Sequence, residues 1–108
     1  MAHQEHQSCI EACQRCAQEC EHCGDACIGE NRPECARICI DCADICWSAA
    51  GYMSRGSSQM AAVCHLCADI CDVCAAECAK HKNEHCKRCA EACRRCAAEC
   101  RKMAGAMA

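Results

Sequence analysis

Large apolar side chains are almost missing from this sequence. It has no phenylalanine, one tryptophan, one tyrosine and a single leucine, Leu66. The 53% share of hydrophobic residues is mostly alanine and cysteine, whose small side chains bury little apolar area and make few dispersion contacts. A core of ordinary composition is therefore not available, and something else is expected to help hold the interior together.

Other absences narrow the class of protein. No run of 18 apolar residues could span a bilayer, and a net charge of −3 favours neither a nucleic-acid nor a membrane partner. The first residues, Met1 to Gln7, lack an apolar segment and a twin-arginine pair, so no export signal is expected. We therefore expect one domain spanning 1–108, in the cytoplasm, where thiols stay reduced.

Cysteine dominates what is present, with 20 of the 108 residues. Within four blocks, neighbouring cysteines alternate between spacings of three and four, which gives seven CxxC and nine CxxxC pairs. This spacing puts every cysteine at an a or d position of a heptad repeat, on one helix face. A role as an ordinary small hydrophobe does not account for such regularity. The cysteines are Cys9, Cys13, Cys16, Cys20, Cys23, Cys27, Cys35, Cys39, Cys42, Cys46, Cys64, Cys67, Cys71, Cys74, Cys78, Cys86, Cys89, Cys93, Cys96 and Cys100.

Four blocks predict four helices, at about 3–28, 33–52, 58–80 and 83–103. Pro33 suits the first turn of the second helix. Ser57 or Ser58 is expected to cap the third helix and Asn83 the fourth, with a frayed tail after Met103. Short connections make sequential helices antiparallel neighbours. The expected fold is an all-α, up-down-up-down four-helix bundle with a cysteine-lined core.

Disulfides do not explain these cysteines. Side chains three or four positions apart on a helix have Cβ atoms about 5–6 Å apart, whereas a disulfide needs about 3.5–4.5 Å. Neighbours along one helix face therefore cannot bridge, although pairs on different helices could do so under oxidation.

Soft metal is the better explanation, because thiolates select Cu(I), zinc or iron–sulfur clusters. Iron–sulfur clusters normally use cysteines on loops that wrap around them. A zinc ion held by four thiolates leaves a net charge of −2, so zinc sites throughout the core would accumulate about ten negative charges. One Cu(I) per thiolate is neutral and allows on the order of one ion per cysteine, or about twenty. The pattern therefore favours Cu(I).

Other metal-binding side chains continue the cysteine face at its ends. In the expected topology His6, Met53, Met60, Met103 and Met107 all lie at one end, where thioether and imidazole groups suit the entry of Cu(I). Met1 and His3 could join them. His81 and His85 lie at the opposite end, as metal ligands or as turn caps, whereas His22 and His65 fall on outward positions.

The outer surfaces of the predicted helices differ. The fourth helix is basic and the first is acidic, so pairing between these neighbours is expected; the residues are Lys87, Arg88, Arg94, Arg95, Arg101 and Lys102, against Glu5, Glu11, Glu19, Glu21 and Asp25. No aromatic residues accompany the basic ones, which argues against nucleic acid. Ile40, Trp47, Leu66 and Val73 occupy outward positions on the two middle helices and indicate an interface between subunits.

These repeated CxxC and CxxxC pairs, such as Cys13-Gln14-Arg15-Cys16 and Cys86-Lys87-Arg88-Cys89, resemble those of the bacterial copper storage proteins, over nearly the whole chain. The lack of a signal sequence makes it similar to the cytosolic branch. The resemblance implies Cu(I) binding by thiolates inside the bundle, entry through an open end, and assembly as a homotetramer.

The expected function is thus cytoplasmic storage of Cu(I), without catalysis. No catalytic triad, phosphate loop or open metal site with a general base is recognisable. Three alternatives stay open: detoxification of zinc or other soft metals, a thiol redox buffer, and a structural oligomer with incidental thiols.

Overall fold

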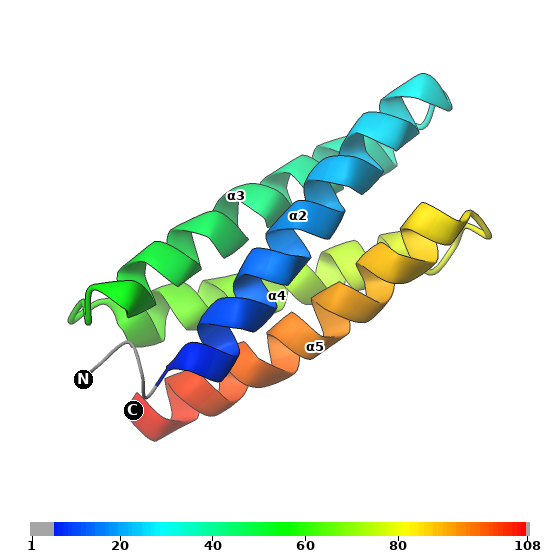
Figure 1. Cartoon of the computed structure of the whole chain (residues 1–108). Helices are drawn as coiled ribbons and strands as arrows, with labels where there is room; N and C mark the ends of the chain where they lie inside the picture. Colours follow the sequence, from blue (N-terminus) through cyan, green and yellow to red (C-terminus); the bar gives the residue numbers. More distant parts are fainter. Residues whose placement is uncertain (1–5, 108) are drawn as a thin grey trace.

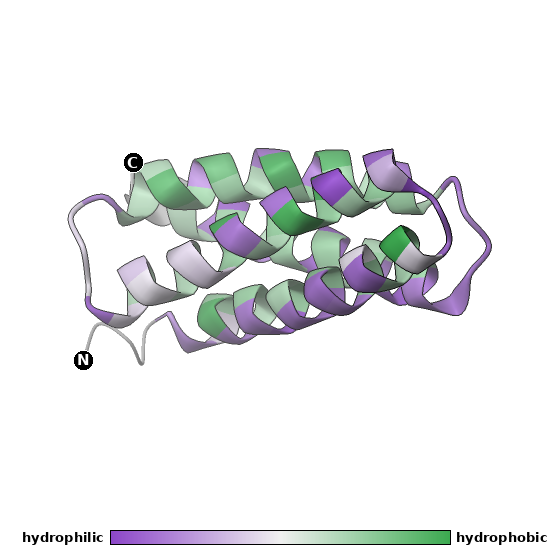
Figure 2. Ribbon diagram, turned by 90° about the horizontal axis from the view of Figure 1, so that it is seen from above, coloured by the Kyte–Doolittle hydropathy of each residue, from purple (hydrophilic) through white to green (hydrophobic). Residues whose placement is uncertain are grey.

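The computed structural model describes the backbone of residues 6–107 and the side chains of 6–105. Its helices are α2 (Gln7–Gly29), α3 (Pro33–Ser54), α4 (Met60–Cys78) and α5 (Glu84–Met107). They run alternately up and down and form a rod with extents of 43 × 18 × 18 Å (Figure 1). Hydrophobic and hydrophilic residues alternate along each helix (Figure 2). The predicted all-α, antiparallel four-helix bundle is confirmed.

Several helix boundaries differ from the predicted ones. The predicted start at position 3 lies outside the described residues, and α2 begins at Gln7. The third helix begins at Met60 instead of 58, because the backbone N–H of Gln59 donates to the Ser57 hydroxyl at 3.0 Å. This bond holds Ser57 in a turn, and Gln59 occupies the cap position that was predicted for a serine.

The C-terminal ends of three helices also differ from the predicted ones. α3 ends at Ser54 and α4 at Cys78, against predicted ends at 52 and 80. α5 does not fray after Met103 but continues to Met107, because Ala104 is buried against the core and alanine favours helix. Backbone N–H groups of Cys86 and Lys87 bond to the Asn83 carbonyl, so Asn83 occupies the position before α5, but its side chain bonds Arg32 and Glu30 rather than the helix N-terminus.

Small side chains next to the cysteine face, most of them directly after a d cysteine, bring the helices together in pairs. α2 packs more closely on α3, and α4 on α5, than the other neighbours do. A Cβ atom added at Gly24 would lie 3.5 Å from the Cβ of Cys39 and 3.6 Å from the Ala36 carbonyl oxygen, which shows how near α3 approaches. Buried alanines occupy the corresponding positions, namely Ala17, Ala36, Ala43, Ala50, Ala68, Ala75, Ala90 and Ala97. Alanine therefore sets the spacing that lets thiols of different helices meet.

Larger side chains fill the wider contact between α3 and α4. Ile38 and Ile45 of α3 and Val63 and Ile70 of α4 are partly buried against the core. The matching contact between α2 and α5 carries Glu11, Glu19, Glu91 and Arg88 around an open surface groove. The two contacts therefore differ: apolar side chains pack between α3 and α4, whereas charged side chains surround the groove on the side formed by α2 and α5.

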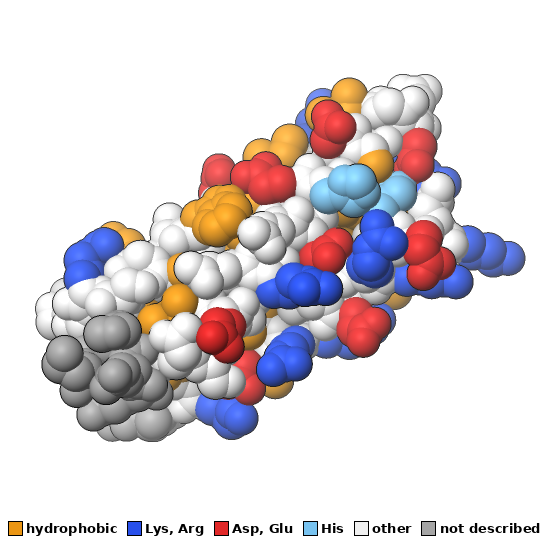
Figure 3. All heavy atoms as spheres, in the orientation of Figure 1, with side chains coloured by type: hydrophobic (Ala, Val, Ile, Leu, Met, Phe, Trp, Pro, Cys, Tyr) orange, Lys and Arg blue, Asp and Glu red, His pale blue; other side chains and the backbone are white. Residues whose placement is uncertain are grey.

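Ion pairs on this charged side follow the expected pattern only in part. Lys and Arg side chains gather along α5 (Figure 3). Arg88 of α5 pairs with Glu19 of α2 at 3.6 Å, as predicted. For Arg101 the prediction is wrong, because its guanidinium reaches Asp72 at 2.6 Å and Asp69 at 3.3 Å, both on its other neighbour α4.

Large apolar side chains are exposed where the sequence predicted them. The exposed fractions are 42% for Ile40 and Trp47, 51% for Leu66 and 56% for Val73. Ile28, at the end of α2, is 60% exposed and was not predicted. None of the helices in the described part of the chain is long and apolar enough to cross a membrane.

Candidate metal centre

All twenty cysteines are buried, and none of them forms a disulfide bond. Each side chain faces the axis of the bundle. The heptad spacing accounts for this, because a and d side chains of four neighbouring helices converge on the same axis. Each helix thus supplies one column of thiols. The interior is a rod of sulfur surrounded by alanine methyl groups.

The middle of the core is a layer with one cysteine from each helix. The Cys16 Sγ lies 4.0 Å from the Sγ atoms of Cys42 and Cys71 and 3.6 Å from that of Cys93. Cys42 lies 3.7 Å from Cys71 and 3.8 Å from Cys93, again between Sγ atoms. We call these four residues the central layer. Two thiolates at such distances can share one ion, and each thiolate can bridge two.

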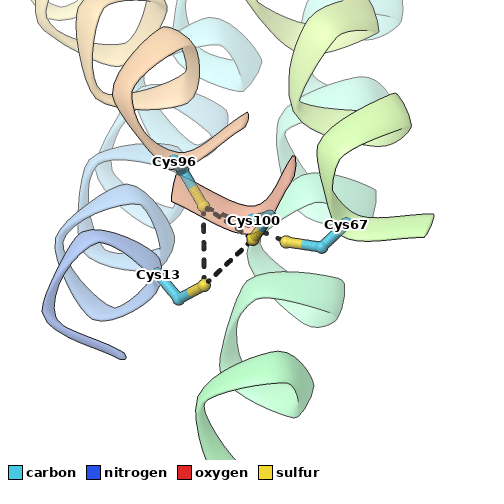
Figure 4. Close-up of side chains that lie close together, drawn as sticks. All are labelled: Cys13, Cys67, Cys96 and Cys100. Atoms are coloured by element: carbon cyan, nitrogen blue, oxygen red, sulfur yellow. Dashed lines mark hydrogen bonds between the residues drawn. The ribbon is translucent and has the colours of Figure 1, made fainter. Parts of the chain in front are cut away.

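Similar groups occur toward both ends. Near the end where α2 begins, Cys13, Cys67, Cys96 and Cys100 approach one another from α2, α4 and α5 (Figure 4). Cys13 lies 3.6 Å from both Cys96 and Cys100, measured between Sγ atoms. In each such group all sulfur atoms lie within 4.8 Å of one another. Further groups include Cys16, Cys20, Cys42 and Cys93; Cys16, Cys46, Cys71 and Cys96; Cys20, Cys74, Cys89 and Cys93; and Cys23, Cys39, Cys78 and Cys89.

These groups merge into one network. Sγ–Sγ contacts of 4.0 Å or less run without interruption from the Cys9–Cys100 pair at one end to the Cys23–Cys86 pair at the other. Only Cys27, Cys35 and Cys64 stand outside these contacts. An ion bound anywhere on the network therefore has another sulfur atom within reach.

Burial keeps the thiols of Cys35 and Cys86, near the end of the bundle where α5 begins, protonated. It raises the pKa of the Cys35 thiol, and it raises the pKa of the Cys86 thiol to about 11, despite the opposing hydrogen bond with Cys23. Near pH 7 a metal ion that binds these thiols must displace their protons. A soft monovalent cation does so without leaving charge in the core, since Cu(I) and one thiolate are neutral together.

The helix ends that carry the residues predicted to line the open end, the starts of α2 and α4 and the ends of α3 and α5, lie together at one end of the bundle (Figure 1). Met53 and Met60 are buried, and Met103 is partly buried. His6 is 7% exposed, and its Nδ1 atom has no hydrogen-bond partner among the described residues. We call His6, Met53, Met60 and Met103 the mouth cluster. Predicted participants Met1 and His3, and the side chain of Met107, lie outside the described residues.

The two histidines predicted for the opposite end differ. His85 is partly buried between sulfur and carboxylate: its Nδ1 lies 3.2 Å from the Cys23 Sγ and its Nε2 2.9 Å from a Glu30 oxygen. His81, in the connection after α4, contacts Glu77 near the end of that helix at 3.3 Å. The His81 ring has no thiol partner among the described residues, so of the two histidines only His85 faces the thiols. His22 and His65 are exposed, as predicted.

Sequence reasoning missed the polar groups around His85. The Arg32 guanidinium donates to the side-chain oxygen Oδ1 of Asn83 at 2.6 Å. The side-chain NH2 group of Asn83 in turn donates to the Glu30 carboxylate at 3.2 Å. These residues lie in the two connections at this end of the bundle, where no heptad pattern relates them. We call Glu30, Arg32, Asn83 and His85 the polar clasp.

Comparison with known proteins gives one family and a set of similar structures. The profile of the family described as copper storage protein, Csp, matches residues 2–105. Among curated proteins no sequence matches this chain.

Solved structures agree with the family match. Copper storage protein 3 of Bacillus subtilis, in its apo form, is 47% identical with a TM-score of 0.87, covering 91% of this chain and 97% of its own. The Cu(I)-bound copper storage protein BsCsp3 is 44% identical with a TM-score of 0.86, covering 91% and 96%. A cytosolic copper storage protein of Streptomyces lividans, described with five coppers, is 38% identical with a TM-score of 0.88, covering 96% and 95%.

Proposed function

The chain belongs to the copper storage protein family, and from that premise we propose that it stores Cu(I) in the cytoplasm, as thiolate-bound ions inside the bundle. The observation that carries this function is the continuous sulfur network. A protein that needed one structural metal ion would require four thiols, and a redox protein would require an accessible pair. Twenty buried thiols on four columns suit neither role.

The proposed ligands are the twenty cysteines, with a capacity on the order of one Cu(I) per cysteine. Bridging makes this ratio attainable, because each thiolate in a group can bind two ions and each ion two thiolates. His85 completes the far end, since its Nδ1 faces the thiols of Cys23 and Cys86 at 3.2 and 3.5 Å. His81 is not proposed as a ligand.

An anaerobic titration of the fully reduced protein tests this function. Cu(I) is added in the presence of a competing chelator, and bound copper is counted per chain. We expect a ratio near the number of cysteines, with unchanged helicity because the core is preformed. A ratio of one to five, or preference for Zn(II) in direct competition, contradicts storage and supports structural or detoxifying use of the thiols.

The mouth cluster is the proposed entry. His6 offers a buried nitrogen that lacks a partner among the described residues, and Met53, Met60 and Met103 belong to the helix ends at the same end of the bundle. Weak, exchangeable ligands of this kind pass a soft ion inward without trapping it.

Replacing Met53, Met60, Met103 and Met107 together by leucine is expected to slow copper loading severalfold and leave capacity intact. Leucine keeps the apolar volume but has no sulfur. Stopped-flow absorbance of the growing Cu–thiolate bands measures the rate. Replacement of Ile38 and Ile45 by leucine is the matched control, since these residues pack on the core away from sulfur. Equal rates in all three proteins rule out the mouth cluster as entry.

The exposed apolar residues of α3 and α4 are the proposed subunit contact of a homotetramer. Ile40, Trp47, Leu66 and Val73 are large apolar side chains that remain exposed in a chain with few of them. Changing Trp47 and Val73 to glutamine is expected to release smaller species, measured by light scattering after size exclusion. An unchanged mass, or a wild-type monomer at micromolar concentration, contradicts the proposal.

A further inference from the structure

His85 presents different atoms to its two surroundings. Its ring is 11% exposed and lies between the last thiols of the core and the two connections that close this end. The Nδ1 atom faces the Sγ atoms of Cys23 and Cys86. The Nε2 atom faces Glu30, at 2.9 Å from Oε2 and 3.1 Å from Oε1.

The carboxylate decides which ring nitrogen carries the proton. An ionised carboxylate only accepts hydrogen bonds, so the contact with Glu30 requires a proton on Nε2. In the neutral ring the lone pair then lies on Nδ1. That atom accepts a hydrogen bond from a thiol in the apoprotein, and it is the atom that faces sulfur-bound metal.

Glu30 is itself held in place from both connections. Asn83, before α5, donates to its Oε2 at 3.2 Å, and Arg32, before α3, lies 3.6 Å from its Oε1. Arg32 also donates to Asn83. The turn that carries Glu30 is fixed by its backbone: Asn31 adopts a left-handed φ of 59°, and the Arg32 N–H bonds to the Cys27 carbonyl at 2.8 Å. The carboxylate therefore has little freedom to leave the ring.

We propose that Glu30 is a positioning residue for Cu(I) binding: held by Arg32 and Asn83, it fixes the Nε2–H tautomer of His85 and so directs the Nδ1 lone pair to the ions bound by Cys23 and Cys86. This role rests on the proposed storage function. Carboxylate partners of metal-binding histidines typically change metal affinity 10–100-fold when removed. The far end of the store thus depends on a residue that never touches copper.

NMR of the reduced apoprotein tests the tautomer without any metal. Long-range ¹H–¹⁵N correlations of ¹⁵N-histidine-labelled protein identify the protonated nitrogen of His85. We expect Nε2–H in the wild type and in Glu30→Gln, whose amide oxygen still accepts. In Glu30→Lys the ammonium group only donates, so the proton is expected to move to Nδ1. Wild-type tautomers in Glu30→Lys overturn the proposal.

Copper titration followed at the same ring tests the consequence. The His85 resonances report occupancy of the far end alone, and Glu30→Lys is expected to need 10–100-fold more free Cu(I) for the same change. Glu77→Lys is the matched control, because Glu77 bonds the Nε2 of His81 at the same end; it is expected to leave His85 unaffected. An equal shift in wild type and Glu30→Lys overturns the proposal.

Failure of storage gives a different result. One such result is a wild type that binds no Cu(I) while the His85 tautomer still changes in Glu30→Lys. In that case the storage function is wrong, whereas the positioning of the ring by Glu30 stands. Should Glu30→Lys lose helicity, Glu30→Ala replaces it, with a mixture of tautomers as the expected result and a pure Nε2–H ring as the contradicting one.

Discussion

Copper-loaded protein is expected to unfold at least about 20 °C above the reduced apoprotein. The apo core consists of thiols and alanine methyl groups, so it has few of the dispersion contacts that large side chains supply. Metal ions that bridge thiolates of three or four helices link the bundle from inside, as the groups in the core allow.

The magnitude follows from linkage. Each ion held in the folded protein at a thousandfold excess over its dissociation constant contributes about 4 kcal/mol, less any binding to the unfolded chain. CxxC pairs of the unfolded chain do bind Cu(I), so we count only a net gain of about 5 kcal/mol for the whole store. One kcal/mol shifts the melting temperature of a domain of this size by about 4 °C.

Thermal unfolding followed by circular dichroism under anaerobic conditions measures this shift. Removal of copper by a strong chelator should return the protein to its apo melting temperature, which excludes oxidation as the cause. Equal or lower stability after loading would show that the ions bind outside the folded core.

Serine at the four positions of the central layer is expected to remove at least about four Cu(I) from the capacity, because the alcohol does not replace a soft thiolate ligand. Three of the named four-cysteine groups lose a member in the variant Cys16→Ser, Cys42→Ser, Cys71→Ser, Cys93→Ser. The groups nearest the two ends keep all their thiols. The variant should therefore retain two separate stores, one at each end.

A matched control carries serine at the neighbouring buried alanines. Ala17, Ala43, Ala68 and Ala97 are also one per helix, and they are at most 2% exposed. Both variants place four hydroxyl groups in the interior, where each can bond to the preceding turn. Only the cysteine variant should lose capacity, counted as copper per chain. A similar loss in both proteins would mean that packing, and not ligation, had failed.

The heptad pattern was enough to predict the bundle and the inward direction of every cysteine. Spacings of three and four have one geometric meaning on a helix, and the short connections allow one topology. The sequence also placed the mouth residues at one end, because heptad register continues beyond the cysteines. These predictions depend on repetition, which averages over local detail.

Features without repetition were not predictable. The contact between Glu30 and His85 joins the connection after α2 to the first turn of α5, 55 residues along the sequence, and nothing periodic relates them. Arg101 has acidic neighbours on either side, and only the packed bundle shows that α4 receives its side chain. The extra turn of α5 likewise depends on a surface for Ala104 to pack against.

The sulfur network is long and narrow, and its two ends carry different side chains, with methionines at one end and His85 at the other. Ions that enter at the mouth cluster and move from thiol to thiol cross the layers of the core before they reach His85. If the mouth cluster is also the exit, an ion bound beside His85 has the longest path out of the protein and is the last to leave. Recently acquired copper then exchanges quickly with the cell, and the deepest copper forms a reserve with the longest residence time.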